Sequence, residues 1–191
     1  ITPKVHVKKD SGLYHPTMKY TNQLADMIQA VTKVGDIVLD PFMGSGSTAV
    51  ACIETERRYI GFEIDEKYFN ICNKRIDLAL AEHPEYNLSS DYLGMLLDIP
   101  YTPTTFTLFE DCSIDMAYFD ICEKDSDIPY EFFEKVIEKQ KKPNFYIMTT
   151  MKQFSEVLMY FKKQDYQFDI IGNFQSDGTK YLLFFRKGGV K

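Results

Sequence analysis

The sequence has no apolar run long enough to span a bilayer, no internal repeat and no low-complexity tract. It opens without a secretory signal pattern, so we expect a cytoplasmic protein. Cysteine is scarce, and its four positions lie far apart without paired metal-ligand spacing: Cys52, Cys72, Cys112 and Cys122. We therefore expect no membrane segment and no metal site, and we interpret Cys52 and Cys72 as buried thiols of a reducing compartment.

Positive charge is also in deficit, because 22 Lys and Arg against 28 Asp and Glu give a formal net charge of −6. This balance argues against a protein that coats nucleic acid through net charge alone, but it does not exclude an enzyme that acts on DNA. Basic residues gather in two places: Lys4, His6, Lys8 and Lys9, and then Lys139, Lys141 and Lys142. Either cluster suits phosphate contacts, although a solvated charged face is the interpretation that we favour for both.

The 191 residues are 45% hydrophobic and 15% aromatic, which suits one globular domain with a sizeable core. Strand-like and helix-like segments alternate, and the last two strand-like runs are typical of a hairpin. Thr21 or Asn22 is expected to cap the first helix, and Asp65 the helix that follows the second strand. We predict one α/β domain over residues 1–191, with a mostly parallel seven-stranded sheet, a C-terminal antiparallel hairpin and helices on both faces. Residues 1–14 are expected to form a flexible arm and residues 84–104 a long irregular loop, with the third strand at 105–109.

Residues 37–48, with the sequence IVLDPFMGSGST, are the most informative stretch. A β-branched run ends at Asp40, a turn carries Gly44 and Gly46, and a Ser-Thr pair opens a helix-like segment. The amide groups at such a helix start suit an anionic group, and glycines let a ligand approach the backbone closely. A second strand ends at Glu63, at the chain separation expected for a carboxylate that binds a ribose.

The spacing alone leaves the ligand open. Gly44-x-Gly46-x-x-Ala49 also satisfies the loose dinucleotide-binding pattern, so a nicotinamide oxidoreductase is an alternative. The distinction comes from two motifs taken together, the His-Pro-Thr-Met-Lys of residues 15–19 and the Asp-Pro-Phe-Met-Gly-Ser-Gly-Ser-Thr of residues 40–48.

In this combination the sequence resembles the amino-group DNA methyltransferases, which make N6-methyladenine or N4-methylcytosine from S-adenosylmethionine. The resemblance runs from His15 to about Ile76 and departs mainly at Tyr20, where the family usually has proline. It implies a Rossmann-like methyltransferase fold, S-adenosylmethionine as the cofactor and DNA as a partner. By the same resemblance, the loop and the segment before it hold the methionine end, Glu63 the ribose, and Asp111 and Cys112 the adenine edge. The implied cofactor-binding residues are His15, Thr17, Lys19, Asp40, Phe42, Gly44, Gly46, Ser47, Thr48, Glu63, Ile64, Asp111 and Cys112.

The residues that hold the target amine depart from the family pattern. The family places [Asp/Asn/Ser]-Pro-Pro-aromatic after the fourth strand, where the polar side chain and a backbone carbonyl grip the amine and the aromatic stacks on a flipped base. Here residues 120–123 are Asp-Ile-Cys-Glu, without the prolines or the aromatic. Asp-Ile-Pro-Tyr occurs at 98–101, before the expected third strand and thus at the sheet end away from the cofactor, and again at 127–130. The predicted catalytic residues are Asp120, Asp127, Pro129 and Tyr130.

Two functions therefore follow from the resemblance. One is a DNA methyltransferase acting on adenine N6 or cytosine N4, of the kind found in restriction-modification systems. The other is a catalytically silent S-adenosylmethionine-binding subunit or regulator of a heteromeric methyltransferase. Little chain remains after Glu63 for a recognition domain. Either a small enzyme reads DNA with its arm and the loop of residues 84–104, or a second subunit supplies target recognition, or catalysis has been lost.

Overall fold

The computed structural model describes residues 19–84, 86, 94–98, 114–122, 128–140, 144–173 and 180–187. The chain divides into two compact units, Ile1–Tyr101 and Thr102–Lys191, and each is described by itself. The expected arm at residues 1–14 lies outside the described residues. That residues 1–191 form a single domain stays a prediction.

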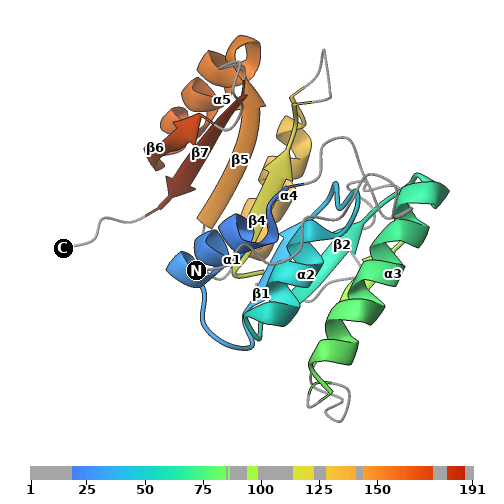
Figure 1. Cartoon of the computed structure of the whole chain (residues 1–191). Coiled ribbons are helices and arrows are strands. Elements are labelled where there is room, and N and C mark those ends of the chain that lie inside the picture. Colours follow the sequence, from blue (N-terminus) through green and yellow to red (C-terminus); the bar gives the residue numbers. More distant parts are fainter. Residues whose placement is uncertain are drawn as a thin grey trace. The chain divides into compact units, whose positions relative to one another are not determined.

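The first unit contains a parallel sheet in the strand order β3-β2-β1 (Figure 1). Its strands are β1 (Ile37–Asp40), β2 (Arg58–Phe62) and β3 (Met95–Leu97), and β2 pairs with both neighbours. Parallel neighbours need a crossover, which α2 (Ser47–Glu54) provides between β1 and β2, while α3 (Glu66–Glu82) follows β2. Because the strands run the same way, the segments that leave β1, β2 and β3 emerge at one edge of this sheet.

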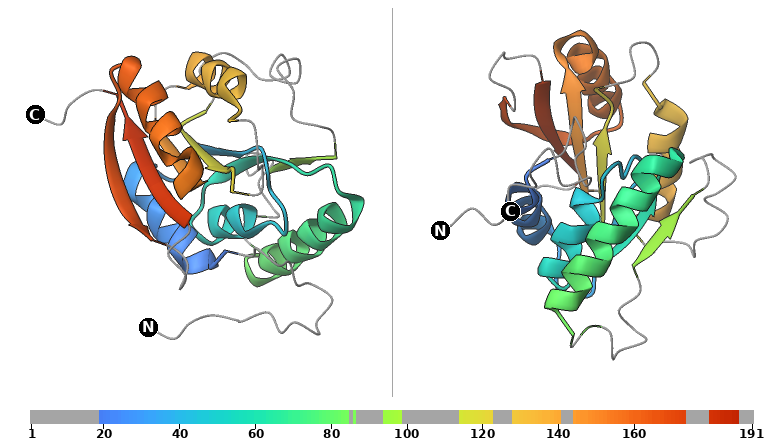
Figure 2. Two further views of the ribbon diagram at one scale, coloured as in Figure 1. Left: turned by 90° about the horizontal axis from the view of Figure 1, so that it is seen from above. Right: turned by 45° about the vertical axis from the view of Figure 1, so that its right-hand side comes forward.

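Helix α1 (Thr21–Val31) packs on α2, and α2 packs on α3 and β2, so that α2 lies between the other two helices (Figures 1 and 2). Arg57 is buried and links the ends of α1 and α2, because its Nε donates to Thr32 Oγ1 at 3.1 Å and its Nη2 to the Thr32 carbonyl at 2.8 Å. Asp65 caps α3 by accepting from the Tyr68 amide at 3.0 Å, as the sequence pattern predicts.

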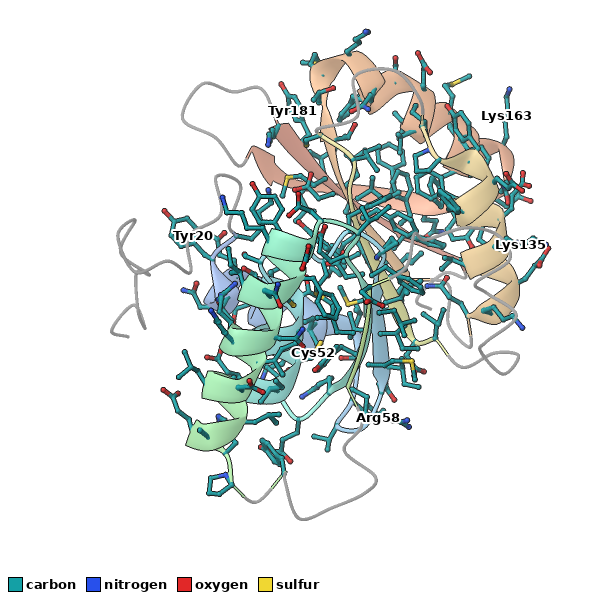
Figure 3. The ribbon with its side chains drawn as sticks, turned by 90° about the vertical axis from the view of Figure 1, so that its right-hand side faces the viewer. Tyr20, Cys52, Arg58, Lys135, Lys163 and Tyr181 are labelled. Atoms are coloured by element: carbon teal, nitrogen blue, oxygen red, sulfur yellow. The ribbon has the colours of Figure 1, made fainter. Side chains whose placement is uncertain are left out.

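The predicted buried thiols are confirmed, because Cys52 on α2 and Cys72 on α3 are both free and fully buried. Figure 3 labels Cys52 among the side chains of the first unit. Cys122 is half-buried and forms no disulfide with a described residue, and Cys112 lies outside the described residues.

The second unit has the strand order β4-β5-β7-β6. β4 (Met116–Asp120) runs parallel to β5 (Asn144–Thr150), whereas β7 (Lys180–Arg186) runs antiparallel to both β5 and β6 (Gln167–Asn173). The predicted C-terminal antiparallel pair is therefore confirmed, and the described strands of the two units number seven, as expected.

Two helices belong to the second unit, α4 (Tyr130–Lys139) and α5 (Met151–Lys163), and α5 packs on β5, β6 and β7. Their inner faces contribute to an aromatic core in which Phe161 stacks on Phe185 at a centroid distance of 4.3 Å and Phe119 meets Phe133 edge-on at 5.0 Å. Lys135 of α4 and Lys163 of α5 lie on the outer sides of their helices (Figure 3).

Two sequence predictions about these elements are wrong. The strand beside β2 is Met95–Leu97, inside the segment 84–104 for which an irregular loop was expected, and not 105–109. A strand of three residues is too short to show the alternation by which strands are recognised, while residues 105–109 lie outside the described residues. The helix that was expected to be capped by Thr21 or Asn22 instead follows Tyr20, whose side chain makes no capping hydrogen bond.

Candidate functional site

The loop of residues 41–46 joins β1 to α2 and depends on two glycines. Gly44 has φ +56° and Gly46 has φ +81°, both in the left-handed region that side chains disfavour. A Cβ on Gly46 would also lie 2.5 Å from Cys72 Sγ, so α3 closes against the loop at this point. Since Gly46 is the N-cap residue of α2 and has no side chain, the first amide groups of the helix have no side-chain cap from it.

Asp40 fixes the entrance to this loop from the end of β1. Its Oδ1 accepts from the Phe42 amide at 3.0 Å and its Oδ2 from Thr48 Oγ1 at 2.5 Å, while both Asp40 and Thr48 are buried. One carboxylate therefore joins the strand end, the turn and the first turn of α2. These two hydrogen bonds of Asp40 therefore stabilise the conformation of the loop.

Glu63 closes the loop from the end of β2. Its Oε2 accepts from the Gly44 amide at 2.8 Å, across 19 positions of sequence, and its Oε1 accepts from the Asp65 amide at 2.8 Å. The structure thus brings together the two residues on which the sequence prediction depends. Next to them Ile64 exposes 71% of its surface, which is high for an apolar side chain.

Gly61 allows the close approach between β2 and the loop. A Cβ at this position would lie 2.2 Å from Met43 Cε, and the Met43 amide donates to the Phe62 carbonyl at 2.9 Å. The loop therefore lies directly on the last residues of β2.

Arg75 of α3 is a part of this site that sequence reasoning missed. It is buried, and its Nη1 donates to the Ser45 carbonyl at 2.6 Å, to Ser45 Oγ at 3.0 Å and to Ser47 Oγ at 3.2 Å. Burial lowers the pKa of this guanidinium. The sequence carries a signal for it, because Arg75 lies four residues after Ile71 and so interrupts the apolar stripe of α3 with a cation.

The end of β3 adds an acid at the same edge of the sheet. The Glu63 amide donates to the Leu97 carbonyl at 3.1 Å, and Asp98 follows directly, exposed to solvent. The expectation that residues 98–101 lie at the far end of the sheet is therefore wrong for Asp98, because it depended on the wrong third strand. Asp111 and Cys112 lie outside the described residues.

In the second unit, Asp120 ends β4 and is bonded to its own chain. Its Oδ1 accepts from the Cys122 amide at 3.2 Å. The Ile121 amide donates to the Met148 carbonyl at 3.0 Å, and the Ile121 carbonyl accepts from Gln153 Nε2 at 3.2 Å. This strand end is held in place by β5 and by the start of α5.

The other predicted site residues are spread over the chain. Pro129 is the N-cap residue of α4, and the ring of Tyr130 packs on Tyr160 at a centroid distance of 4.7 Å. Lys19 is half-buried just before α1, whereas His15, Thr17 and Asp127 lie outside the described residues. Among the described residues no cluster of His, Cys, Asp and Glu could hold a metal ion, and no described helix is long and apolar enough to cross a membrane.

Solved structures define the class of fold. A precorrin-6y C5,15-methyltransferase from Geobacter metallireducens matches with a TM-score of 0.68 and 11% identity, over 91% of this chain and 93% of that one. An rRNA methylase from Streptococcus thermophilus matches with a TM-score of 0.63 and 17% identity, over 91% of this chain and 99% of that one. The predicted fold, an α/β methyltransferase fold, is confirmed.

Sequence comparison gives the family. Residues 1–74 match the family model described as DNA methylase. The type II methyltransferase M2.DpnII of Streptococcus pneumoniae is 44% identical over 63 residues, which are 33% of this chain and 24% of that protein. The DNA adenine methyltransferase YhdJ of Escherichia coli is 40% identical over 77 residues, 40% of this chain and 26% of that protein. Residues 1–74 are thus similar to the DNA methylase family, and the chain spans less than a third of the length of these relatives.

Proposed function

We propose that the protein is a DNA methyltransferase that transfers a methyl group from S-adenosylmethionine to the exocyclic amino nitrogen of adenine (N6) or cytosine (N4). The observation that carries this proposal is the hydrogen bond that the Gly44 amide donates to Glu63 Oε2, which joins the loop of residues 41–46 to the end of β2. It lies in the segment that matches the DNA methylase family model, and relatives named as DNA methyltransferases match that segment. A DNA substrate fits a cytoplasmic protein.

The site fits the cofactor at its methionine end and at its ribose. The uncapped amides at the start of α2, together with the helix dipole, suit the carboxylate of the methionine part, and Gly44 and Gly46 leave room for it. Each oxygen of Glu63 accepts one backbone hydrogen bond and retains acceptor capacity for a ribose hydroxyl. Exposed Ile64 offers an apolar surface beside that position.

For the adenine edge, Asp98 is the acid that we propose. It follows β3, whose last carbonyl accepts from the Glu63 amide, so its backbone is the direct neighbour of the ribose-binding residue. A carboxylate there accepts a hydrogen bond from the amino group of adenine. Asp111 and Cys112, which were predicted for this role, stay predictions.

When bound, S-adenosylmethionine supplies an electrophilic methyl group on its sulfonium sulfur. In this proposal the loop of residues 41–46 holds the donor, and Asp120 has the role that the resemblance implies for the acid after the fourth strand, which is to accept a hydrogen bond from the target amine. The amine loses its proton after attack, so no general base is required. Asp127, Pro129 and Tyr130 stay predicted contributors to the pocket for the target base.

A second candidate function is a silent cofactor-binding subunit, with a partner subunit that supplies catalysis and target recognition. The observation that favours it is the bonding at the end of β4. The family grips the amine with a polar side chain and a backbone carbonyl, and here Asp120 Oδ1 accepts from Cys122 while the Ile121 carbonyl accepts from Gln153. Each of these two groups thus already accepts a hydrogen bond from within the second unit, which leaves it less acceptor capacity for a target amine.

The test measures binding and transfer in the same protein. Calorimetry with S-adenosylhomocysteine reports binding, and labelled S-adenosylmethionine with mixed-sequence DNA, with and without host extract, reports transfer. Transfer that Asp120→Ala abolishes and the exposed-site control Asp77→Ala retains supports the enzyme. Binding without any transfer supports the silent subunit. A thermal shift with NAD and none with S-adenosylhomocysteine would overturn both in favour of a nicotinamide enzyme.

A further inference from the structure

Arg75 is a buried cation on the inner face of α3. Its side chain is only 7% exposed, and a buried guanidinium is costly unless its hydrogen bonds are satisfied. The hydrogen bonds that it makes to described residues all go to neutral oxygens of Ser45 and Ser47. Burial lowers the pKa of Arg75, and the charge of Glu54 opposes that shift and so favours the charged form. The hydrogen bonds of this guanidinium to described residues nevertheless all go to one short segment of the loop, which is an expensive arrangement for packing alone.

The geometry shows what Arg75 does to that segment. Its Nη1 reaches Ser45 and Ser47, the residues on either side of Gly46, so one nitrogen spans the left-handed turn that starts α2. Serine hydroxyls near a helix start readily bond the helix's own amide groups. Because both hydroxyls accept from Arg75, they are held toward α3, and the first amides of α2 are left for another acceptor.

We propose that Arg75 is a positioning residue for the amino-acid carboxylate of the cofactor, and that it acts through the Ser45–Ser47 segment without touching the ligand. This inference rests on the proposed function, because it assumes that S-adenosylmethionine occupies the loop. It predicts that Arg75 matters for ligands that carry the amino-acid end and does not matter for ligands that lack it.

Two ligands and two arginines separate this role from general stability. S-adenosylhomocysteine has the amino-acid end, whereas 5′-methylthioadenosine retains the adenosine and sulfur but lacks that end. Arg57 is the matched control, because it is also 7% exposed but bonds to Thr32 and Thr55, away from the loop.

Calorimetry on wild type, Arg75→Met, Arg75→Lys and Arg57→Met gives the result. We expect Arg75→Met to weaken S-adenosylhomocysteine binding about tenfold or more, the equivalent of one charge-assisted hydrogen bond, with 5′-methylthioadenosine binding within about twofold of wild type. The affinity of Arg75→Lys for S-adenosylhomocysteine should lie between those of wild type and Arg75→Met, because lysine keeps the charge but not the guanidinium geometry. Arg57→Met should lower the melting temperature and leave both affinities within about twofold.

Two outcomes overturn the inference. If wild type binds both ligands and the ratio of the two affinities is the same in Arg75→Met, Arg75 is a packing residue and only this inference fails. If Arg75→Met does not fold, the affinity ratio in Arg75→Lys decides in the same way. A wild-type protein that binds neither ligand overturns the proposed function, and this inference with it.

Discussion

The contact between the loop of residues 41–46 and α3 predicts that substitutions at Gly46 and Cys72 have coupled effects on stability. Gly46→Ala should destabilise the fold for two reasons. The backbone has φ +81°, where an L side chain is strained, and the new Cβ would lie 2.5 Å from Cys72 Sγ. The sulfur is buried on α3, so it has little room to move away.

The two contributions to this loss of stability can be estimated separately. The left-handed conformation costs about 1–2 kcal/mol for a residue with a Cβ, and overpacking a buried contact costs about 1–3 kcal/mol more. Gly46→Ala should therefore lower the free energy of unfolding by about 2–5 kcal/mol. Removing the sulfur with Cys72→Ala relieves only the overpacking. The free energy of unfolding of the double variant should therefore exceed the value expected from adding the two single losses by about 1–3 kcal/mol.

Urea denaturation of wild type, both single variants and the double variant measures this coupling directly. Gly35→Ala is the control for the backbone alone, because Gly35 has φ +80° and a Cβ there would meet nothing within 4 Å. If Gly46→Ala costs no more than Gly35→Ala, or if the Gly46 and Cys72 effects add to within about 0.5 kcal/mol, the close packing of α3 on the loop is refuted.

Three further variants or conditions test the same unit. Glu63→Gln should lower the free energy of unfolding by about 1–3 kcal/mol in urea denaturation, because either the Gly44 amide or the Asp65 amide then faces an NH₂ group in place of an acceptor oxygen. An unchanged free energy of unfolding would contradict these two hydrogen bonds. Thr48→Val removes the hydroxyl that donates to Asp40 and should lower the melting temperature by about 3–12 °C. Thr48→Ser keeps the hydroxyl and should melt near wild type. An equal fall in melting temperature in both variants would contradict the role given to this hydrogen bond. Burial raises the pKa of the Cys72 thiol to about 12, so above about pH 8.5 the unfolded chain loses this proton while the folded chain keeps it. Stability should therefore fall as pH rises, by up to about 1.4 kcal/mol per pH unit for this thiol, and urea denaturation from pH 7 to 10.5 should give a shallower slope in Cys72→Ala than in wild type.

The contacts around the loop of residues 41–46 were largely predictable because they are local or follow from strand order. Asp40 and Thr48 are eight positions apart, which strand, turn and first helical turn bring together. Glu63 and Gly44 meet because β1 and β2 are parallel neighbours, so whatever follows one strand lies beside whatever follows the other. Sequence order is enough to predict both pairs.

The missed features depend on context that the sequence does not carry locally. Met95–Leu97 is a strand only because β2 offers it a free edge, and its three residues have no pattern of their own; Asp98 was misplaced with it. Arg75 differs, because its position on the buried stripe of α3 was visible. What could not be foreseen was its acceptors, which come from a loop 28 to 30 positions earlier in the chain.

The missing prolines after Asp120 have a physical consequence that the bonding of β4 makes plain. Proline has no amide hydrogen, so in the family motif neither residue after the acid can donate to it or to the next strand. Here both residues have that hydrogen and both use it: Ile121 donates to the Met148 carbonyl of β5, and Cys122 donates back to Asp120 Oδ1. These two amides thus add one bond between β4 and β5 and one bond between Asp120 and its own chain. Because the loop around Gly44 and the end of β4 are built from different elements, a change at one need not alter the other, and binding and transfer therefore have to be measured separately.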